Sequence, residues 1–168
     1  MAIKRRITPG STGLEAVEVQ KDLIEKRFRN SICHDLKMTY SMDVKIRYGE
    51  VDRQGVVFNA HYLAYLDDVV DSWLREFEGD FESLGWDLML KNANLEWHGP
   101  AGTGEVLTIE ANVSRWGNTS FDISFEVKVE ERLVLNAIIV YVGVKTGTTE
   151  TLKAPEQIRK YLSDGKVS

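Results

Sequence analysis

The chain has 168 residues, of which 43% are hydrophobic; this is enough for one domain with a sizeable core and too little for two ordinary domains. Its formal net charge is −5 and 28% of its residues are charged, which argues against a general nucleic-acid binder. No apolar run approaches the roughly 18 residues of a membrane span, and the lone cysteine, Cys33, excludes an internal disulfide. The composition therefore predicts a cytoplasmic protein that binds neither nucleic acid nor membrane.

The first 40 residues are predicted to form an N-terminal extension of the main domain, residues 41–168. Residues 1–13 are rich in proline, glycine and serine, as in a disordered tail, and their basic triplet is not followed by the apolar stretch of a secretory signal. In residues 14–28, apolar side chains recur at roughly helical spacing among many charges, which predicts a short amphipathic helix. This helix either covers a sheet edge or a subunit interface, or is a mobile appendage.

The main domain is predicted to begin with a half-buried strand and a long helix. Residues 42–48 alternate, with Met42, Val44, Ile46 and Tyr48 on one face and charged residues on the other. Residues 59–77 carry apolar side chains at helical spacing, and a helix of this length spans roughly 27 Å. The apolar stripe of this helix is wide enough for a sheet to wrap around it.

Four further strands are predicted after Gly79, at residues 88–97, 106–116, 120–130 and 133–145, because apolar runs there are separated by turn signals. No helix intervenes, so an antiparallel meander is expected. Pro155 suits the start of a last helix, residues 156–162. The fold class is α+β, an antiparallel sheet around a central helix. Residues 121–129 and 138–144 are apolar enough for edge pairing or face packing between subunits, which predicts a homo-oligomer.

Chemistry is indicated most clearly between the first strand and the long helix. Asp52 lies seven residues before Asn59, where the helix is predicted to start, and Gly55 lies in the turn between them. If this loop folds back, the carboxylate shares one small volume with the first unpaired backbone N–H groups of the helix. The segment then combines an acid with a site that stabilises a negatively charged oxygen.

Here the chain resembles the hotdog-fold acyl-CoA thioesterases, in particular the 4-hydroxybenzoyl-CoA thioesterase-like group. The resemblance covers roughly three-quarters of the chain, and its core residues are Tyr48, Asp52, Gly55, Val56, Val57, Phe58 and Tyr62. It implies a hotdog homodimer or homotetramer with active sites at the dimer interface, acting on acyl-CoA without a cofactor. It also implies that Asp52 is the nucleophile or general base and that the backbone N–H of Asn59 polarises the thioester carbonyl.

Two residues depart from the family pattern. Many members carry histidine or tyrosine in place of Asn59, but the implied role belongs to the backbone, so hydrolysis stays plausible while acyl specificity is open. His61 is unusual where small or amide side chains are common. It is expected either to donate a hydrogen bond near the thioester or to be a surface residue of the first helical turn.

Each candidate residue also has a structural interpretation. Asp52 is an anion at neutral pH, suited to attack a thioester carbon or to take a proton from water, but it can equally cap the turn or pair with Arg47 or Arg53. The side chain of Asn59 is expected to cap the helix. Gly55 allows a positive φ or a close approach of substrate. The residues expected to line an acyl pocket, or simply to fill the core, are Val57, Phe58 and Tyr62.

Other polar residues give weaker signals. His61 and His98 make no recognised metal-ligand set with Cys33 or His34, so no metal site is predicted. The helix carries three acids that are expected to form a solvated face and to be the fallback if Asp52 is not the catalytic acid: Asp67, Asp68 and Asp71. Coenzyme A needs cationic partners for its phosphates, and four are available near strand ends: Arg115, Lys128, Arg132 and Lys145.

The sequence therefore predicts an acyl-CoA thioesterase. The same site would serve an acyl group held on a carrier protein, and a non-catalytic protein that binds acyl thioesters is the rival from another class. A hotdog dehydratase is disfavoured because that chemistry relies on a catalytic histidine, and none lies where the acid motif needs it.

Overall fold

The computed structural model describes residues 39–77, 79 and 82–164, all within the second of the two units into which the chain divides, Leu36–Ser168. The helix expected at residues 14–28, together with Cys33 and His34, lies outside the described residues. No helix in the described part is long and apolar enough to cross a membrane. The elements in order are β1 (Tyr40–Lys45), the 3₁₀ helix η1 (Tyr48–Glu50), α2 (Asn59–Arg75), the 3₁₀ helix η2 (Glu82–Leu84), β2 (Trp86–Trp97), β3 (Val106–Trp116), β4 (Ser120–Val129), β5 (Arg132–Lys145) and α3 (Glu156–Asp164).

The strands form one five-stranded sheet in the order β1-β3-β4-β5-β2, and every neighbouring pair is antiparallel. The expected meander is therefore wrong for β2, which pairs with β5 at the far edge instead of with β3. Only β3, β4 and β5 follow one another through hairpins. The two edges of the sheet are β1 and β2, so edge pairing between subunits through β4 or β5 is also excluded, because each has a partner on both sides.

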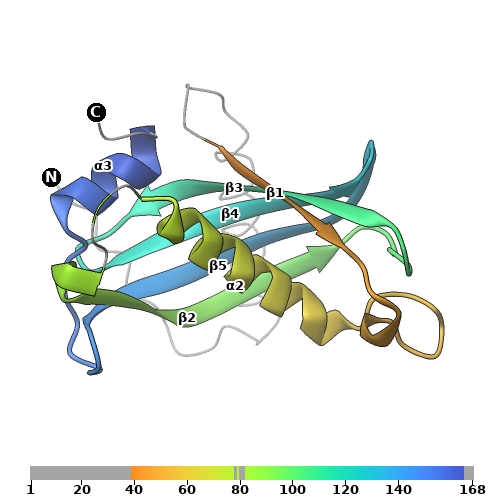
Figure 1. The fold of residues 1–168 in the computed structure, drawn as a ribbon, viewed down its shortest axis with the longest axis horizontal. Helices are drawn as coiled ribbons and strands as arrows, with labels where there is room; N and C mark the ends of the chain where they lie inside the picture. Colours follow the sequence, from red (N-terminus) through yellow and green to blue (C-terminus); the bar gives the residue numbers. More distant parts are fainter. Residues whose placement is uncertain (1–38, 78, 80–81, 165–168) are drawn as a thin grey trace, which may run out of the picture. The chain divides into compact units, whose positions relative to one another are not determined.

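Helix α2 packs against one face of the sheet, as Figure 1 shows. Its buried side chains follow helical spacing, and three of them, Leu66, Val69 and Trp73, are completely buried. The facing side chains alternate along the three central strands: Leu107, Ile109, Ala111 and Val113 on β3; Phe121, Ile123, Phe125 and Val127 on β4; Leu135, Ala137, Ile139 and Tyr141 on β5. Burial of each large side chain is worth roughly 1.5–3 kcal/mol, so packing rather than helix propensity stabilises α2.

The element boundaries differ from prediction where the chain approaches the candidate site. Strand β1 ends at Lys45, and the 3₁₀ helix η1 follows almost at once. Tyr48 therefore does not share the buried face of the strand and is 85% exposed. Helix α2 starts at Asn59 as expected but ends at Arg75, where the N–H of Glu76 donates to the Leu74 and Ser72 carbonyls.

The link between β2 and β3 must cross the end of the sheet, because β5 and β4 lie between these two strands. We call residues 98–105 the crossing segment. The N–H groups of His98 and Gly99 donate to the carbonyl of Val134 on β5, and the N–H of Ile46, just after β1, donates to the carbonyl of Glu105. The crossing segment thus connects β5 with the point at which the chain leaves β1.

Candidate active site

The loop between η1 and α2, residues 50–58, folds back on itself, and we call it the acid loop. The N–H of Asp52 donates to the Val56 carbonyl at 2.8 Å, and the N–H of Phe58 donates to the Glu50 carbonyl at 3.0 Å. A bridge between Val51 and Val57 lies between these two hydrogen bonds. The loop therefore folds back as predicted, and its two arms are paired along their length.

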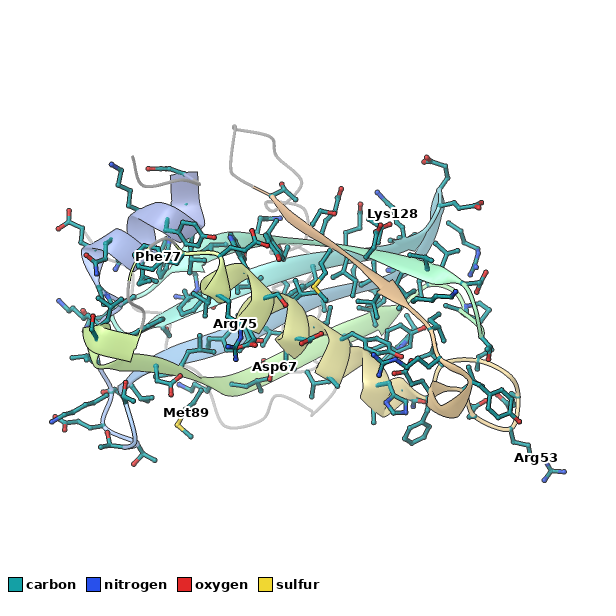
Figure 2. All side chains as sticks on the ribbon, in the orientation of Figure 1. Arg53, Asp67, Arg75, Phe77, Met89 and Lys128 are labelled. Atoms are coloured by element: carbon teal, nitrogen blue, oxygen red, sulfur yellow. The ribbon has the colours of Figure 1, made fainter. Side chains whose placement is uncertain are left out.

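Asp52 shapes the turn at the tip of this loop. Its Oδ1 accepts the N–H of Gln54 at 2.8 Å, and its carbonyl accepts the N–H of Gly55 at 2.9 Å. Gly55 has φ +79°, a conformation that favours glycine, so the turn requires this residue whether or not a ligand approaches. Arg53 extends outward from the tip (Figure 2), and no ion pair joins it to Asp52 in the described chain. The turn-capping interpretation of Asp52 is thus correct for one carboxylate oxygen, while the other oxygen makes no such bond to any residue that the structure describes.

The helix start differs from the prediction in its cap. Phe58, with φ −64° and ψ 132°, occupies the N-cap position, no side chain caps the helix, and Asn59 is the first helical residue. The expected capping role of the Asn59 side chain is therefore wrong. The acid loop ends at Phe58, so the N-cap position lies one residue before the asparagine. Within the described residues no acceptor is hydrogen-bonded to the backbone N–H of Asn59. An N–H of this kind at the positive end of a helix is suited to receive an anionic oxygen.

The predicted pocket residues divide into core and surface. Val57 is 5% exposed and Tyr62 is 3% exposed, so both belong to the core. Phe58 is 51% exposed and lies edge-on to the half-buried ring of His61, with 6.2 Å between ring centroids. Trp97, at the end of β2, is 48% exposed and lies edge-on to Tyr62. Aromatic rings therefore cluster at the first turn of α2, and Phe58 and Trp97 are the most exposed of these rings.

Sequence reasoning missed Glu50, a second acid two residues before Asp52. Its side chain is 17% exposed, and Oε2 accepts the backbone N–H of Arg47 at 2.7 Å, which closes η1. Burial favours the neutral acid, but the Arg47 N–H, the neighbouring Tyr65 hydroxyl and the charges of Arg47 and His61 outweigh it, so the pKa of Glu50 lies below its usual value. The buried Tyr65 hydroxyl has no hydrogen-bond partner of normal geometry within the described chain, so it acts on Glu50 as a nearby dipole. The signal for Glu50 was its spacing from Arg47, which is typical of a capping box.

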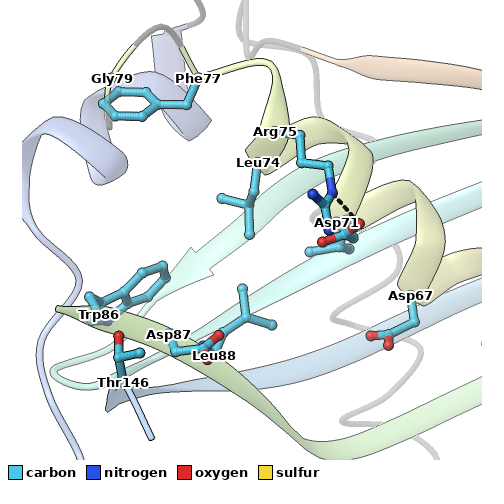
Figure 3. A pocket seen from close by; sticks show the side chains of 11 residues that line it. Asp67, Asp71, Leu74, Arg75, Phe77, Gly79, Trp86, Asp87, Leu88 and Thr146 are labelled. Carbon is cyan, nitrogen blue, oxygen red and sulfur yellow. Dashed lines mark hydrogen bonds and ion pairs between the residues drawn. The ribbon is translucent and has the colours of Figure 1, made fainter. Parts of the chain in front are cut away.

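A cavity of about 930 Å³ lies between the second half of α2 and the start of β2 (Figure 3). Asp67 and Asp71, both on α2 and both exposed as predicted, face Trp86, Asp87 and Leu88 of β2 across it. Asp71 pairs with Arg75 at 2.6 Å. Asp67 accepts a hydrogen bond from the Tyr141 hydroxyl at 3.1 Å, and burial, followed by the charge of Asp67, raises the pKa of Tyr141. The fallback acid Asp67 therefore lies in a cavity that is not lined by Asp52.

Of the four cations suggested for coenzyme A phosphates, three are already paired. Arg115 makes a bidentate pair with the buried Asp122, both contacts being 2.7 Å, and Lys128 pairs with Glu126. Arg132 pairs with Glu105 at 2.6 Å. No cluster of three or more potential metal ligands occurs among the described residues, where His98 Nε2 lies 3.1 Å from the side-chain nitrogen of Asn136.

Comparison with known proteins shows which family the chain matches. The model of the thioesterase-like superfamily matches residues 46–162, which include the acid loop, α2 and strands β2 to β5. A 1,4-dihydroxy-2-naphthoyl-CoA hydrolase from Trichodesmium erythraeum is 24% identical over 124 residues, covering 70% of this chain and 90% of the relative.

Two solved structures share the fold. A 1,4-dihydroxy-2-naphthoyl-CoA thioesterase from Synechocystis has a TM-score of 0.66 at 19% identity, covering 74% of this chain and 96% of that chain. The dynemicin thioesterase, described with a bound polyene, has a TM-score of 0.68 at 16% identity, covering 74% and 95%.

The predicted hotdog fold and the predicted enzyme class, a thioester hydrolase, are thereby confirmed. With more than half of its length matched by the family model, the chain belongs to the thioesterase-like superfamily.

Proposed function

We propose that this chain hydrolyses an acyl-CoA thioester, with Asp52 as nucleophile or general base and the backbone N–H of Asn59 as oxyanion donor. The supporting observation is the folded acid loop, in which hydrogen bonds pair residues 50 and 52 with residues 58 and 56. In support, the second carboxylate oxygen of Asp52 accepts no hydrogen bond within the described chain, and the loop leads directly into α2, where the N–H of Asn59 is likewise unpaired.

Two routes are compatible with this arrangement. As nucleophile, the carboxylate attacks the thioester carbon, the carbon–sulfur bond breaks, and the thiolate leaves; water then cleaves the resulting anhydride and restores Asp52. As general base, Asp52 takes a proton from water, the hydroxide adds to the same carbon, and the tetrahedral intermediate expels the thiolate. In both routes the carbonyl oxygen becomes negative and is stabilised by the Asn59 N–H.

The test is steady-state hydrolysis of aromatic, short-chain and long-chain acyl-CoA esters. Asp52→Asn is expected to lower kcat on the best substrate by at least about 100-fold, as loss of an acid–base group does. Asn59→Ala is expected to lower it by less than tenfold, since its backbone N–H is retained. Asp164→Asn, the same change at the exposed end of α3, is the control. A folded Asp52→Asn variant with wild-type kcat removes Asp52 from the mechanism.

Asp67 is the second candidate for the catalytic acid, favoured by its place on the wall of the 930 Å³ cavity and by its hydrogen bond from Tyr141. Asp67→Asn belongs in the same series. If Asp67→Asn abolishes hydrolysis while Asp52→Asn does not, the reaction takes place in the cavity between α2 and β2 and not at the acid loop.

The acyl carrier remains to be chosen by experiment. The same acyl group is presented on coenzyme A and on an acyl carrier protein, and we expect coenzyme A to give the higher kcat/KM. A thioester-binding protein without catalysis, the rival suggested by Asn59 and His61, is recognised by tight binding with no thiol release.

We further propose that the enzyme is a homodimer that pairs through the outer edge of β2. This strand has 12 residues, its second edge has no partner strand in the described chain, and it exposes Met89 (48%), Leu90 (41%) and Trp97 (48%). The other edge strand, β1, has only six residues. A long edge with exposed apolar side chains is a natural surface for pairing with a second chain.

A further inference from the structure

The crossing segment is bonded to the chain before η1 and to the second arm of the acid loop. Before η1, the N–H of Ile46 donates to the Glu105 carbonyl, and the N–H of Gly104 donates to the Ile46 carbonyl, both at 3.0 Å. In the second arm, the N–H of Val57 donates to the Ala101 carbonyl at 2.8 Å, and Val56 forms a bridge with Gly102. Residues 101–105 therefore hold the chain in place before η1 and again just before α2 begins.

The two loops are packed closely as well as hydrogen-bonded. Ala101 is 2% exposed and Val57 is 5% exposed. A Cβ atom placed on Gly102 would lie 3.2 Å from the carbonyl oxygen of Gly55, so even a small side chain there would press against the backbone of the turn. A displacement of the crossing segment is consequently transmitted to the turn that carries Asp52.

One ion pair fixes the crossing segment. Glu105 Oε2 accepts the N–H of Gly102 at 2.6 Å, while Glu105 Oε1 pairs with Arg132 Nη2 at 2.6 Å. Arg132 Nη1 donates to the carbonyl of Pro100. The planar guanidinium at the start of β5 thus holds residues 100 and 105 together with two of its nitrogens, a geometry that a lysine cannot reproduce.

The same ion pair lies near the first turn of α2. Burial raises the pKa of the Tyr62 hydroxyl, and the charges of Arg132 and Glu105 act on that hydroxyl in opposite directions. Tyr62 is a core residue of the first turn of the helix. The Arg132–Glu105 pair therefore anchors the last residue of the crossing segment to β5 and acts electrostatically on the first turn of α2.

We propose that the Arg132–Glu105 ion pair is a positioning device for the reaction: it holds the crossing segment in the conformation that aligns Asp52 with the N–H of Asn59. Neither side chain touches substrate in this role. The inference rests on the proposed function, because alignment matters only if these two groups act together.

Because the ion pair is exposed, its effect on the reaction rate can be distinguished from its effect on folding stability. The Arg132 and Glu105 side chains are 44% and 37% exposed. A pair as exposed as this typically contributes less than about 1 kcal/mol to folding. Misplacement of reacting groups by about 1 Å, in contrast, costs roughly 100-fold in rate. Loss of the pair should therefore reduce turnover and leave thermal stability almost unchanged.

The kinetic experiment uses Arg132→Ala, Glu105→Gln and the double variant, each assayed with an acyl-CoA and with the same acyl group on N-acetylcysteamine. We expect kcat to fall roughly 10- to 100-fold on both substrates, with KM little changed and the double variant no slower than the single ones. Glu126→Gln, which breaks another exposed ion pair on β4, is the matched control and should retain wild-type kcat.

A different result would assign Arg132 to the coenzyme A phosphates. In that case Arg132→Ala raises KM for the acyl-CoA only, the truncated thioester is hydrolysed at the wild-type rate, and Glu105→Gln has no effect. This pattern overturns the positioning role.

Hydrogen exchange tests the device without reference to activity. The N–H groups of Ile46 and Val57, bonded to the crossing segment, should exchange up to about fivefold faster in Arg132→Ala and Glu105→Gln and at the wild-type rate in Glu126→Gln. Unchanged protection overturns the inference. If exchange changes as expected while the wild type hydrolyses no thioester, the proposed function fails and the fixing of the acid loop by the ion pair stands.

Discussion

Two acids separated by one residue have different surroundings in the acid loop. Glu50 is largely enclosed and its Oε2 accepts the backbone N–H of Arg47, so its role is to close η1. Among residues 39–77, 79 and 82–164, Asp52 is hydrogen-bonded through one carboxylate oxygen, to the N–H of Gln54, and its turn lies at the tip of the loop. The carboxylate with the spare oxygen is the better candidate for chemistry, and the enclosed one for support.

The support from Glu50 is expected to depend on pH. Its folded pKa is lower than its usual 4.5, so its contribution to stability is complete above about pH 4.5 and is lost as the pH falls through the lower folded value. Glu50→Gln should lower the free energy of unfolding by about 1 kcal/mol at pH 7, and the difference from wild type should shrink in acid.

Urea unfolding between pH 3 and pH 7 measures this difference. Glu96→Gln, at an exposed position of β2, is the control. A deficit in Glu50→Gln that is constant over the whole range would show that the charge of Glu50 is not responsible.

At the residue scale, the sequence predicted the acid, the turn glycine and the helix start but not their partners. Of the structural roles it offered Asp52, the turn cap is present, with the backbone N–H of Gln54 as donor, whereas no ion pair with Arg47 or Arg53 occurs in the described chain. It placed the cap at Asn59 because asparagine is a favoured N-cap residue. Hydrogen bonds between the arms of the loop override that preference, and such bonds leave no trace in local composition.

At the scale of elements, apolar runs bounded by turn signals predicted the strands closely, even though β4 and β5 bury residues on both faces. Residues 106–116 were predicted as a strand and form β3 without a change at either end. The strand order was not predictable from the same pattern. The order depends on the pairing of β2 with β5, although β3 and β4 lie between them in the sequence. An alternating pattern shows which side chains share a face of a strand, and it does not show which strand is the hydrogen-bonded neighbour.

Strand β5 contains a glycine that the packing requires. A Cβ atom on Gly143 would clash with the indole nitrogen of Trp86 and with the carbonyl of Leu152, and Trp86 is 1% exposed and cannot easily move. Gly143→Ala should therefore destabilise the protein by roughly 1–3 kcal/mol, as overpacking does.

Thermal unfolding checks this effect, with Gly49→Ala as the control, because no atom lies within 4 Å of a Cβ placed there. Equal melting temperatures for Gly143→Ala and the wild type would mean that Trp86 repacks.

At the scale of the whole molecule, the proposed dimer gives β2 a second partner. If β2 pairs across a two-fold axis, placing charges on its exposed apolar residues should separate the subunits. The double variant Met89→Lys/Leu90→Lys should be monomeric at micromolar concentration, where the wild type is dimeric. Leu152→Lys, at a residue of similar exposure outside β2, should remain a dimer.

Sedimentation equilibrium distinguishes these states. If the wild type itself sediments as a monomer, or if the doubly charged variant retains the wild-type mass, the β2 edge is not the subunit interface.

The strand order also has a consequence for folding. Strands β3, β4 and β5 are joined by hairpins and pair locally, whereas β1 must find a partner far along the chain, as the bond between Asp43 and Thr108, 65 residues apart, illustrates. Closing so long a loop is slow compared with hairpin formation, so β1 is expected to dock late and to bring the acid loop with it. During refolding, the sheet can then be well formed before Asp52 is seated. The spectroscopic signal of the sheet is therefore expected to recover before hydrolytic activity does, and the delay between the two measures the docking of β1.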